Sequence, residues 1–252
     1  MRTLGYNIIY LIQLIRFFGT VDGMKIFIKI IAGKELIKIK SPKFKNTIEI
    51  RKKDSDLPIF YQVFNELQYD ITYYLDYKPL NIIDCGSNVG YSCLYFATLF
   101  PEAQIVGIEP EINNYKQFCK NTSAYSNIKP INAAIWHEES YVTIMNNEEL
   151  SAGFVMEEGK AGATSLKAIT IGSIMRENQF CEIDVLKLDI EGTELNLFSN
   201  NPHAWLGKTR CLIIELHDNL KPGTSQIFFR EMSKYNWRTF IRGENIICFK
   251  AG

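Results

Sequence analysis

The sequence predicts an α/β protein built around a doubly wound, mostly parallel β-sheet with an antiparallel hairpin at its C-terminal edge. From Leu80 onward, short apolar runs alternate with longer helical segments, which is the order of strands and helices in such a sheet. Acidic residues follow several of these runs, where parallel strands would end. The last two runs, 236–241 and 245–250, are separated only by Arg242-Gly243-Glu244 and predict the hairpin.

A helical and hairpin cap is expected before this sheet. Apolar patterning predicts helices over residues 4–18 and 23–32, and alternating apolar and polar residues predict a hairpin from 35–40 and 47–52 around Ser41-Pro42. We therefore divide the chain into an N-terminal cap, 1–55, and a main domain, 56–252.

The first helix raises the question of membrane contact. Its apolar run from Ile8 to Ile15 is too short to span a bilayer and lacks a small-residue cleavage site, so no transmembrane segment is expected. Its apolar positions almost surround the helix, which indicates a buried helix or one that forms a homodimer. Peripheral contact through an interfacial membrane helix is the alternative.

The main domain is expected to begin with a helix at Asp56, whose apolar face holds Ile59, Val63, Phe64 and Leu67. Parallel strands are then predicted over residues 80–84, 104–109, 128–135, 182–189 and 211–217. Helices are predicted over 89–100, 112–123 and 224–235. Residues 136–170 are less regular, with a strand at 141–145 and a Gly-rich excursion at 151–164.

The composition excludes some functions. The 28 basic residues balance 28 acidic ones, and a net charge of zero argues against a nucleic-acid partner. The six cysteines are scattered, form no C-x-x-C pair and lie partly in apolar runs. They are therefore expected to be reduced thiols in a cytoplasmic protein, rather than disulfides or zinc ligands.

The segment from Asp84 to Gly90 carries the strongest functional signal. It places an acid and a glycine-spaced turn, D-x-G-x-N-x-G, between the first parallel strand and the next helix. Glycines let backbone N–H groups approach a nucleoside cofactor at such a junction. The dinucleotide fingerprint G-x-G-x-x-G would need glycines in place of Asn88 and Tyr91, which disfavours a nicotinamide-dependent oxidoreductase.

Acids are predicted at the carboxyl ends of four strands: Asp84, Glu109, Asp189 and Glu215. Doubly wound sheets bind ligands at this edge. Glu109 follows Asp84 by 25 residues, near the spacing of about 20 at which an acid holds a ribose. Asp189 and Glu191 flank a sharp turn, and two carboxylates so close together suit proton abstraction or cation binding. Glu194 is placed at a helix N-terminus, where the dipole favours an acid.

Together, D-x-G-x-N-x-G at 84–90, Glu109 and K-x-D-x-E-G at 187–192 resemble the FkbM family of methyltransferases, over about residues 50 to 250. The resemblance implies a seven-stranded Rossmann-like methyltransferase sheet, S-adenosylmethionine as methyl donor, and O-methylation of a sugar, glycan or secondary metabolite.

The resemblance also implies the residues that bind the donor. These are Asp84, Gly86, Ser87, Asn88, Gly90, Glu109, Ala134, Trp136 and Asp189. The glycines and Ser87 would lie against the methionine portion, Glu109 would hold the ribose, and Ala134 and Trp136 would border the adenine. Asp189 would face both the sulfonium and the acceptor.

Methylation of a hydroxyl needs a group that takes its proton. His217, beside Asp218 after the fifth strand, is the best base by residue type, and Asp189 and Glu191 complete the predicted catalytic set. His137 and His203 lie in less informative contexts. Magnesium held by Asp189, Glu215 and Asp218 is an alternative activator that stays open. A non-catalytic donor-binding scaffold is also open, although intact Asp189 and Glu191 disfavour it.

Overall fold

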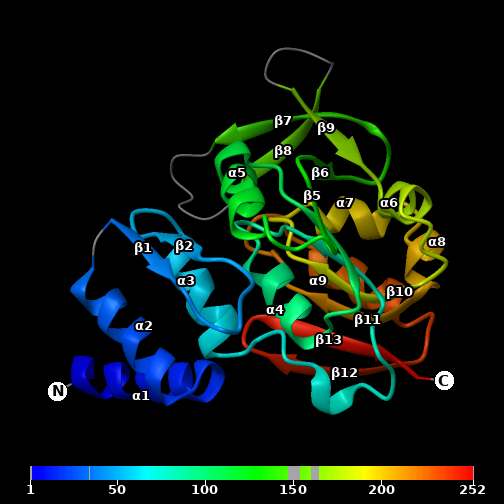
Figure 1. Ribbon diagram of the computed structural model, residues 1–252. Helices are drawn as coiled ribbons and strands as arrows, with labels where there is room; N and C mark the ends of the chain where they lie inside the picture. The colour runs from blue at the N-terminus through cyan, green and yellow to red at the C-terminus, as the bar shows by residue number, and fades with distance from the viewer. Residues whose placement is uncertain (1, 34, 147–153, 160–164, 252) are drawn as a thin grey trace.

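The computed structural model describes residues 2–33, 35–146, 154–159 and 165–251. Its centre is a seven-stranded sheet in the spatial order β12-β13-β11-β10-β3-β4-β5 (Figure 1). The strands are β3 (Asn81–Cys85), β4 (Gln104–Ile108), β5 (Ile128–Ile131), β10 (Ile183–Leu188), β11 (Thr209–Ile214), β12 (Trp237–Arg242) and β13 (Asn245–Lys250). β13 pairs antiparallel with both β11 and β12, and the other neighbouring strands of this sheet pair parallel. The predicted mostly parallel sheet is confirmed, with the reversed strand β13 inside it and β12 at the edge.

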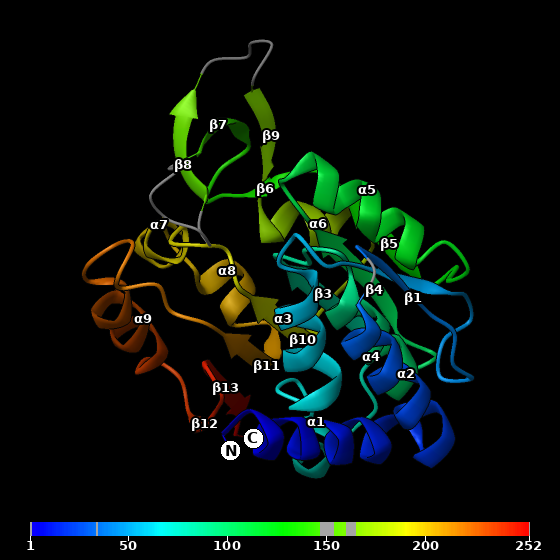
Figure 2. The same ribbon diagram turned by 90° about the vertical axis from the view of Figure 1, so that its left-hand side faces the viewer.

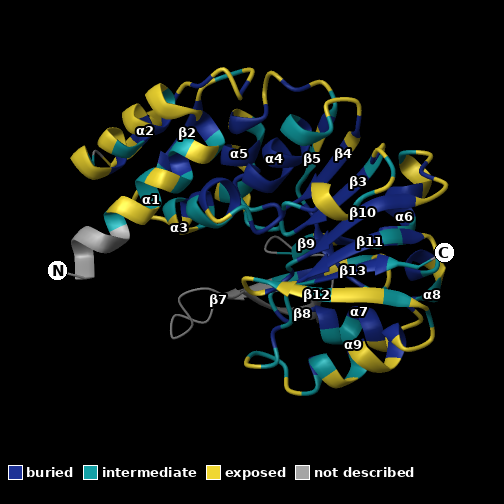
Figure 3. Cartoon of the chain, turned by 90° about the horizontal axis from the view of Figure 1, so that it is seen from below, coloured by how far each residue is buried: buried dark blue, intermediate teal, exposed yellow. Residues whose placement is uncertain are grey.

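Alternating side chains of the central strands enter two hydrophobic cores, one on each face of the sheet. Ile82 of β3 and Val185 of β10 belong to the first core, whereas their neighbours Ile83 and Leu186 belong to the second. Strands that are buried on both faces appear in a sequence as continuous apolar runs. Figure 3 shows the central strands as buried and much of the edge strand β12 as exposed.

Helices cover both faces of the sheet. On the first face lie α4 (Tyr91–Leu99) and α5 (Ile112–Asn121), and on the second lie α6 (Ile171–Glu177), α7 (Glu194–Ser199), α8 (His203–Leu206) and α9 (Thr224–Met232). The helices expected over 89–100, 112–123 and 224–235 are present, shortened at their ends. The sequence did not predict α6, which is short and begins with a capping box formed by Thr170 and Ser173.

The strand predicted over 128–135 is instead two strands in different sheets. β5 ends at Ile131, and β6 (Ala134–Ile135) pairs with β9 (Ser165–Ile169) in a second sheet of order β6-β9-β7-β8. Between them, the side-chain amide of Asn132 donates to the carbonyl oxygens of Glu109 and Pro110 at 2.8 and 3.0 Å. These bonds hold the chain where it leaves β4.

The rest of the second sheet comes from the irregular segment. β7 (Ser140–Asn146) confirms the strand predicted at 141–145, and it pairs antiparallel with β8 (Phe154–Gly159) and β9. β8 lies within the Gly-rich excursion, of which residues 151–153 and 160–164 are outside the described residues.

Two helices and a hairpin precede the main sheet. They are α1 (Arg2–Phe18), α2 (Thr20–Ala32) and the antiparallel strands β1 (Leu36–Ile39) and β2 (Ile48–Arg51), as predicted. Figures 1 and 2 show them together at one side of the molecule. Their buried side chains belong to the same continuous core as those of β3 and α4. The division into a 1–55 cap and a 56–252 domain therefore stays a prediction about folding units.

Aromatic rings join this N-terminal region to α4. Phe18 stacks on Phe60 with ring centroids 6.1 Å apart, and Phe64 meets Tyr91 at 5.8 Å. The helix predicted at Asp56 is α3 (Asp56–Phe60), which continues as a π-helical turn over Tyr61–Asn65. In the part of the chain that is described, no helix combines the length and the hydropathy needed to cross a membrane.

Candidate active site

The turn between β3 and α4 bends so tightly that Gly86, Asn88 and Gly90 all have positive φ angles, 81°, 48° and 84°. A side chain on Gly86 would collide with the carbonyl oxygen of Asp189, just beyond β10, and one on Gly90 would collide with the ring of Phe118. Conformation and space therefore both require glycine at these two positions. The turn lies at the carboxyl ends of the parallel strands, as the glycine spacing predicted.

Glu109, the first residue after β4, is held against this turn. One carboxylate oxygen accepts a hydrogen bond from the backbone N–H of Asn88 at 2.8 Å, and the other accepts one from Glu111 at 2.9 Å. Burial raises the pKa of Glu109 to about 7, although the two backbone N–H groups lower it. Each carboxylate oxygen has a second lone pair. The carboxylate can therefore accept two further hydrogen bonds while it stays attached to the turn.

Asp84 lies beneath the turn and has no exposed surface. Its carboxylate is 3.2 Å from the ammonium of Lys187 and accepts a hydrogen bond from the hydroxyl of Ser92. Lys187 also donates to the carbonyl oxygen of Gly86 at 3.0 Å. The hydroxyl of Ser87 turns inward as well and donates to the carbonyl oxygen of Asp84 at 2.8 Å. Asp84 thus supports the turn from below, and its expected part in donor binding stays a prediction.

Neighbouring carboxylates keep Lys187 positively charged. Burial lowers its pKa, but the carboxylate of Asp84 and the other anionic neighbour, Asp189, outweigh burial and hold the pKa well above its ordinary value. The lysine was not singled out as a site residue. The sequence nevertheless indicates its importance, because Lys187 is a charged residue inside a mostly apolar, buried strand and therefore needs a charged partner.

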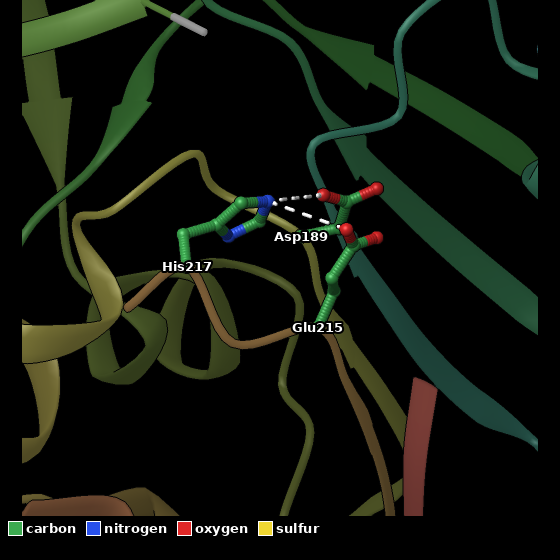
Figure 4. A group of neighbouring side chains, drawn as sticks. All are labelled: Asp189, Glu215 and His217. Carbon is green, nitrogen blue, oxygen red and sulfur yellow. Dashed lines mark ion pairs between the residues drawn. The ribbon is translucent and has the colours of Figure 1, made fainter. Parts of the chain in front are cut away.

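A second group of polar side chains gathers where β10 and β11 end. Nε2 of His217 lies 3.9 Å from a carboxylate oxygen of Asp189 and 3.5 Å from one of Glu215 (Figure 4). An oxygen of Glu191 is also 3.5 Å from this nitrogen. On the other side of the ring, Nδ1 lies 2.9 Å from Oε1 of Glu194. We call these five residues the acid–histidine group.

Glu194 is the member of this group whose contact with His217 the sequence did not indicate. It is the first residue of α7, as its predicted helix N-terminal position requires, but its side chain has no exposed surface. Besides its contact with His217, it accepts a hydrogen bond from the backbone N–H of Ile190 at 3.1 Å. The carboxylate is therefore fixed between the turn after β10 and the imidazole.

The pKa values of three members of the acid–histidine group, Glu191, Glu215 and His217, are all raised. Burial and the charge of Asp189 raise the pKa of Glu191 and of Glu215 to about 7. Burial lowers the pKa of His217, but the hydrogen bond and charge of Glu194, with the other carboxylates, raise it to about 9. His217 is therefore a cation at neutral pH, while Glu191 and Glu215 can each gain or lose a proton there.

Glu191 shows a further sign of a functional constraint. Its φ angle is 52°, in the left-handed region that residues with a side chain seldom occupy. Such conformations are maintained only where the surrounding structure enforces them, and they concentrate at functional sites. Here the conformation directs the carboxylate toward Nε2 of His217.

Part of the acid–histidine group could hold a metal ion. Ligand atoms of Asp189, Glu215 and His217 all lie within 4.8 Å of one another. Two carboxylates and an imidazole are suitable ligands for a divalent cation. Asp218, the third metal candidate from the sequence, is not part of this group. Its carboxylate accepts hydrogen bonds from the backbone N–H groups of Gly223 and Ser225 at 3.2 and 3.0 Å, at the start of α9.

The remaining predicted residues lie outside the acid–histidine group. Ala134 and Trp136 are buried in a small core beneath the second sheet, just beyond the segment that bonds to Glu109. His203 has Nδ1 2.9 Å from the hydroxyl of Tyr235 and joins α8 to the end of α9. His137 lies beside Glu138, with 3.9 Å between its Nε2 and a carboxylate oxygen of Glu138.

The strand order, the glycine turn after β3 and the acid after β4 fit the Rossmann-like methyltransferase sheet expected from the sequence. The model of the methyltransferase FkbM domain matches residues 84–242, and the chain therefore belongs to the FkbM methyltransferase family. The family resemblance seen in the sequence is thus confirmed.

Individual relatives are distant. The AMB antimetabolite synthetase AmbE of Pseudomonas aeruginosa is 20% identical over 183 residues, which cover 57% of this chain and only 9% of AmbE. The FkbM methyltransferase structure from Methylobacillus flagellatus is 16% identical, with a TM-score of 0.49, and the match covers 73% of this chain and 47% of that one. An O-methyltransferase from Bacillus cereus in complex with SAH is 10% identical, with a TM-score of 0.41, over 77% of this chain and 79% of that one.

Proposed function

We propose that the protein is an S-adenosylmethionine-dependent O-methyltransferase whose acceptor is a hydroxyl of a sugar, a glycan or a secondary metabolite. The observation that carries this proposal is the position of Asp189. Its carbonyl oxygen packs against Gly86 of the turn, and its carboxylate belongs to the acid–histidine group. One residue therefore joins the place proposed for the methyl donor to the place proposed for the acceptor, and methyl transfer requires such proximity.

The residues around the turn fit the donor. Bound S-adenosylmethionine would supply a methyl group activated by a sulfonium. Gly86, Ser87, Asn88 and Gly90 are proposed to pack against its methionine portion. The N–H groups of Gly86 and Ser87 already donate to the carbonyl oxygen of Ile108, and that of Asn88 donates to Glu109, so the proposed contact is one of close packing. The free lone pairs of Glu109 suit the two ribose hydroxyls. Ala134 and Trp136 are proposed to border the adenine, since the chain that leads to them bonds to the backbone of Glu109.

The acid–histidine group is proposed to receive the proton of the acceptor hydroxyl. His217 has a pKa of about 9 and already carries a proton at neutral pH, so it is not the first acceptor. Glu191, with a pKa of about 7, can accept one. We therefore assign Glu191 as the general base and His217 as the cation that stabilises the surrounding carboxylates. Asp189 orients the acceptor beside the donor.

A divalent cation is the other means of activating the hydroxyl, and Asp189, Glu215 and His217 would be its ligands. His217 already places a positive charge among these carboxylates. We therefore expect methyl transfer to persist in EDTA. A loss of activity that Mg²⁺ restores would instead assign these residues as metal ligands.

The acceptor pocket is proposed to lie between the carboxyl edge of the main sheet, the described parts of the 136–170 segment (136–146, 154–159 and 165–170) and the N-terminal cap. The balanced charge of 28 basic and 28 acidic residues favours a small acceptor over nucleic acid. All six cysteines are free thiols, which supports a cytoplasmic location.

Isothermal titration calorimetry tests the donor. S-adenosylmethionine and its demethylated product should both bind, NAD should not, and Glu109→Ala should weaken donor binding by about tenfold or more. Glu102→Ala, which removes an exposed acid at the opposite end of the main sheet, is the control. Methyl transfer to a panel of hydroxylated sugars and metabolites then separates an enzyme from a donor-binding scaffold. Absence of heat with both nucleosides would refute the proposal.

A further inference from the structure

Helix α2 exposes a stripe of large apolar side chains. Val21, Met24, Ile28 and Ile31 are 64, 47, 60 and 57% exposed. They recur at intervals of three or four residues and so occupy one side of the helix. Neighbouring α1 adds Ile8, Ile9 and Ile12, which are 53 to 60% exposed. We call these seven side chains the outer face, and Figure 3 shows exposed residues along both helices.

The outer face is not the surface by which α2 packs on the protein. That surface consists of Gly23, Ile26 and Ile30, which are buried. Gly23 lies so close to the backbone of Ile15 that a side chain there would collide with α1. The helix is thus anchored by one apolar side while a second apolar side faces outward, which a globular surface does not require.

Basic residues border the outer face. Lys25 and Lys29 follow the stripe along α2, Arg16 lies on α1, and all three are exposed. Residues 1–55 hold 12 of the 28 basic residues but only 4 of the 28 acidic ones. The neutral net charge of the chain therefore conceals a positive N-terminal region and a negative remainder. Exposed aliphatic side chains among lysines are typical of helices that lie at the surface of anionic membranes.

We propose that the outer face of α1 and α2 binds the surface of an anionic lipid bilayer. The isoleucines and Met24 would enter the boundary between headgroups and acyl chains, and the lysines would lie near lipid phosphates. A homodimer is the other occupant to consider. A two-fold contact through α2 would bring Lys25 and Lys29 near the same residues of a second copy, where like charges repel. A membrane provides the opposite charge.

Vesicle flotation tests this proposal with the full chain. Wild-type protein should bind vesicles of phosphatidylcholine mixed with phosphatidylserine, and should bind pure phosphatidylcholine much more weakly. Ile28→Ser/Ile31→Ser should lower the association constant by about tenfold or more. Lys25→Gln/Lys29→Gln should lower it by about tenfold for the mixed vesicles only. Ile241→Ser, at a position on β12 that is 74% exposed, is the matched control and should bind like the wild type.

Several outcomes would overturn the proposal. These are absence of binding to the mixed vesicles, equal binding by the Ile28→Ser/Ile31→Ser variant, and a loss of binding in Ile241→Ser as large as in that variant. Sedimentation velocity without lipid supplies another. A dimer that the Ile28→Ser/Ile31→Ser exchange dissociates would show that the outer face is a subunit interface. The substituted side chains are exposed, so circular dichroism should show an unchanged fold. None of these measurements depends on methyl transfer.

Discussion

Oε1 of Glu194 lies 2.9 Å from Nδ1 of His217, and this contact determines the charge of the imidazole. Glu194 has no exposed surface, so its negative charge acts on the ring with little screening by water. The other nitrogen of the ring faces Asp189, Glu191 and Glu215. Because the ring keeps its proton at neutral pH, Glu191 and Glu215 are the members of this group that can gain or lose a proton there.

Glu194→Gln removes the charge but keeps an oxygen that can contact His217. We expect the pKa of His217 to fall and kcat to drop about 10- to 100-fold, as when the partner of a functional histidine is altered. The KM for the donor should change little, because the hydrogen-bond partners of Glu194 are Ile190 and His217, which lie outside the turn after β3. An NMR titration of the ring and a pH–rate profile measure these effects. Glu177→Gln, exposed on α6, is the control; an unchanged titration of His217 would contradict the assignment.

Lys187→Met should lower the free energy of unfolding by about 3–5 kcal/mol, because it leaves the carboxylate of Asp84 buried without a cation. Urea unfolding measures the change. Lys208→Met makes the same exchange at an exposed position and should cost less than about 0.5 kcal/mol. The double variant Asp84→Asn/Lys187→Met should recover part of the loss. Suppose that the double variant lost as much free energy of unfolding as Asp84→Asn and Lys187→Met lose together when made singly. The lost ion pair would then not explain the instability of Lys187→Met.

Gly86→Ala should abolish donor binding and destabilise the fold, because the added methyl group meets the carbonyl oxygen of Asp189. Gly223 provides a matched control. Its φ angle is 93°, similar to the 81° of Gly86, but nothing lies within 4 Å of an added Cβ. Gly223→Ala should therefore cost only the conformational penalty of about 1–2 kcal/mol and leave donor affinity unchanged. Calorimetry measures donor affinity and urea unfolding measures stability. If Gly86→Ala and Gly223→Ala lowered both by similar amounts, the steric explanation would be contradicted.

Glu109 should make stability and donor affinity depend on pH in opposite directions. Burial raises its pKa from 4.5 to about 7, so the folded protein keeps a proton that the unfolded chain releases. Its stabilising contribution is complete below pH 4.5 and is lost as the pH rises through about 7. Ribose hydroxyls donate hydrogen bonds and prefer the ionised carboxylate, so donor affinity should rise over the same range.

Calorimetry at several pH values measures the donor affinity, and urea unfolding over the same range measures stability. Glu109→Gln should flatten the pH dependence of donor affinity. It should reduce the pH dependence of stability only by the share of Glu109, because Glu191 and Glu215 also have pKa values of about 7. Glu102→Gln, which alters an exposed acid, should preserve both dependences. A donor affinity in the wild type that does not change with pH would argue against an ionised Glu109 at the ribose.

The sheet was predictable because its central strands are buried on both faces. Ile82 and Ile83 point to opposite cores, and both must be apolar, so β3 stands out in the sequence. The break after β5 was not predictable in this way. It depends on hydrogen bonds from Asn132 to Glu109 and Pro110, which are more than 20 residues away in the sequence.

The sequence predicted where the site residues lie as well as it predicted where the strands end. Asp189, Glu191, Glu215 and His217 follow adjacent parallel strands, whose carboxyl ends must meet at one edge. Side-chain direction was not predictable from that rule. Asp84 ends the same kind of strand but points below the turn toward Lys187, and the contact of Glu194 with His217 depends on where α7 begins.

The placement of β13 between β11 and β12 has a consequence for synthesis of the chain. Until residues 245–250 leave the ribosome, β11 presents an unpaired edge of backbone N–H and C=O groups, and β12 has no partner. The sheet can therefore be completed only after Lys250 has emerged, and nascent chains would need protection from aggregation until then.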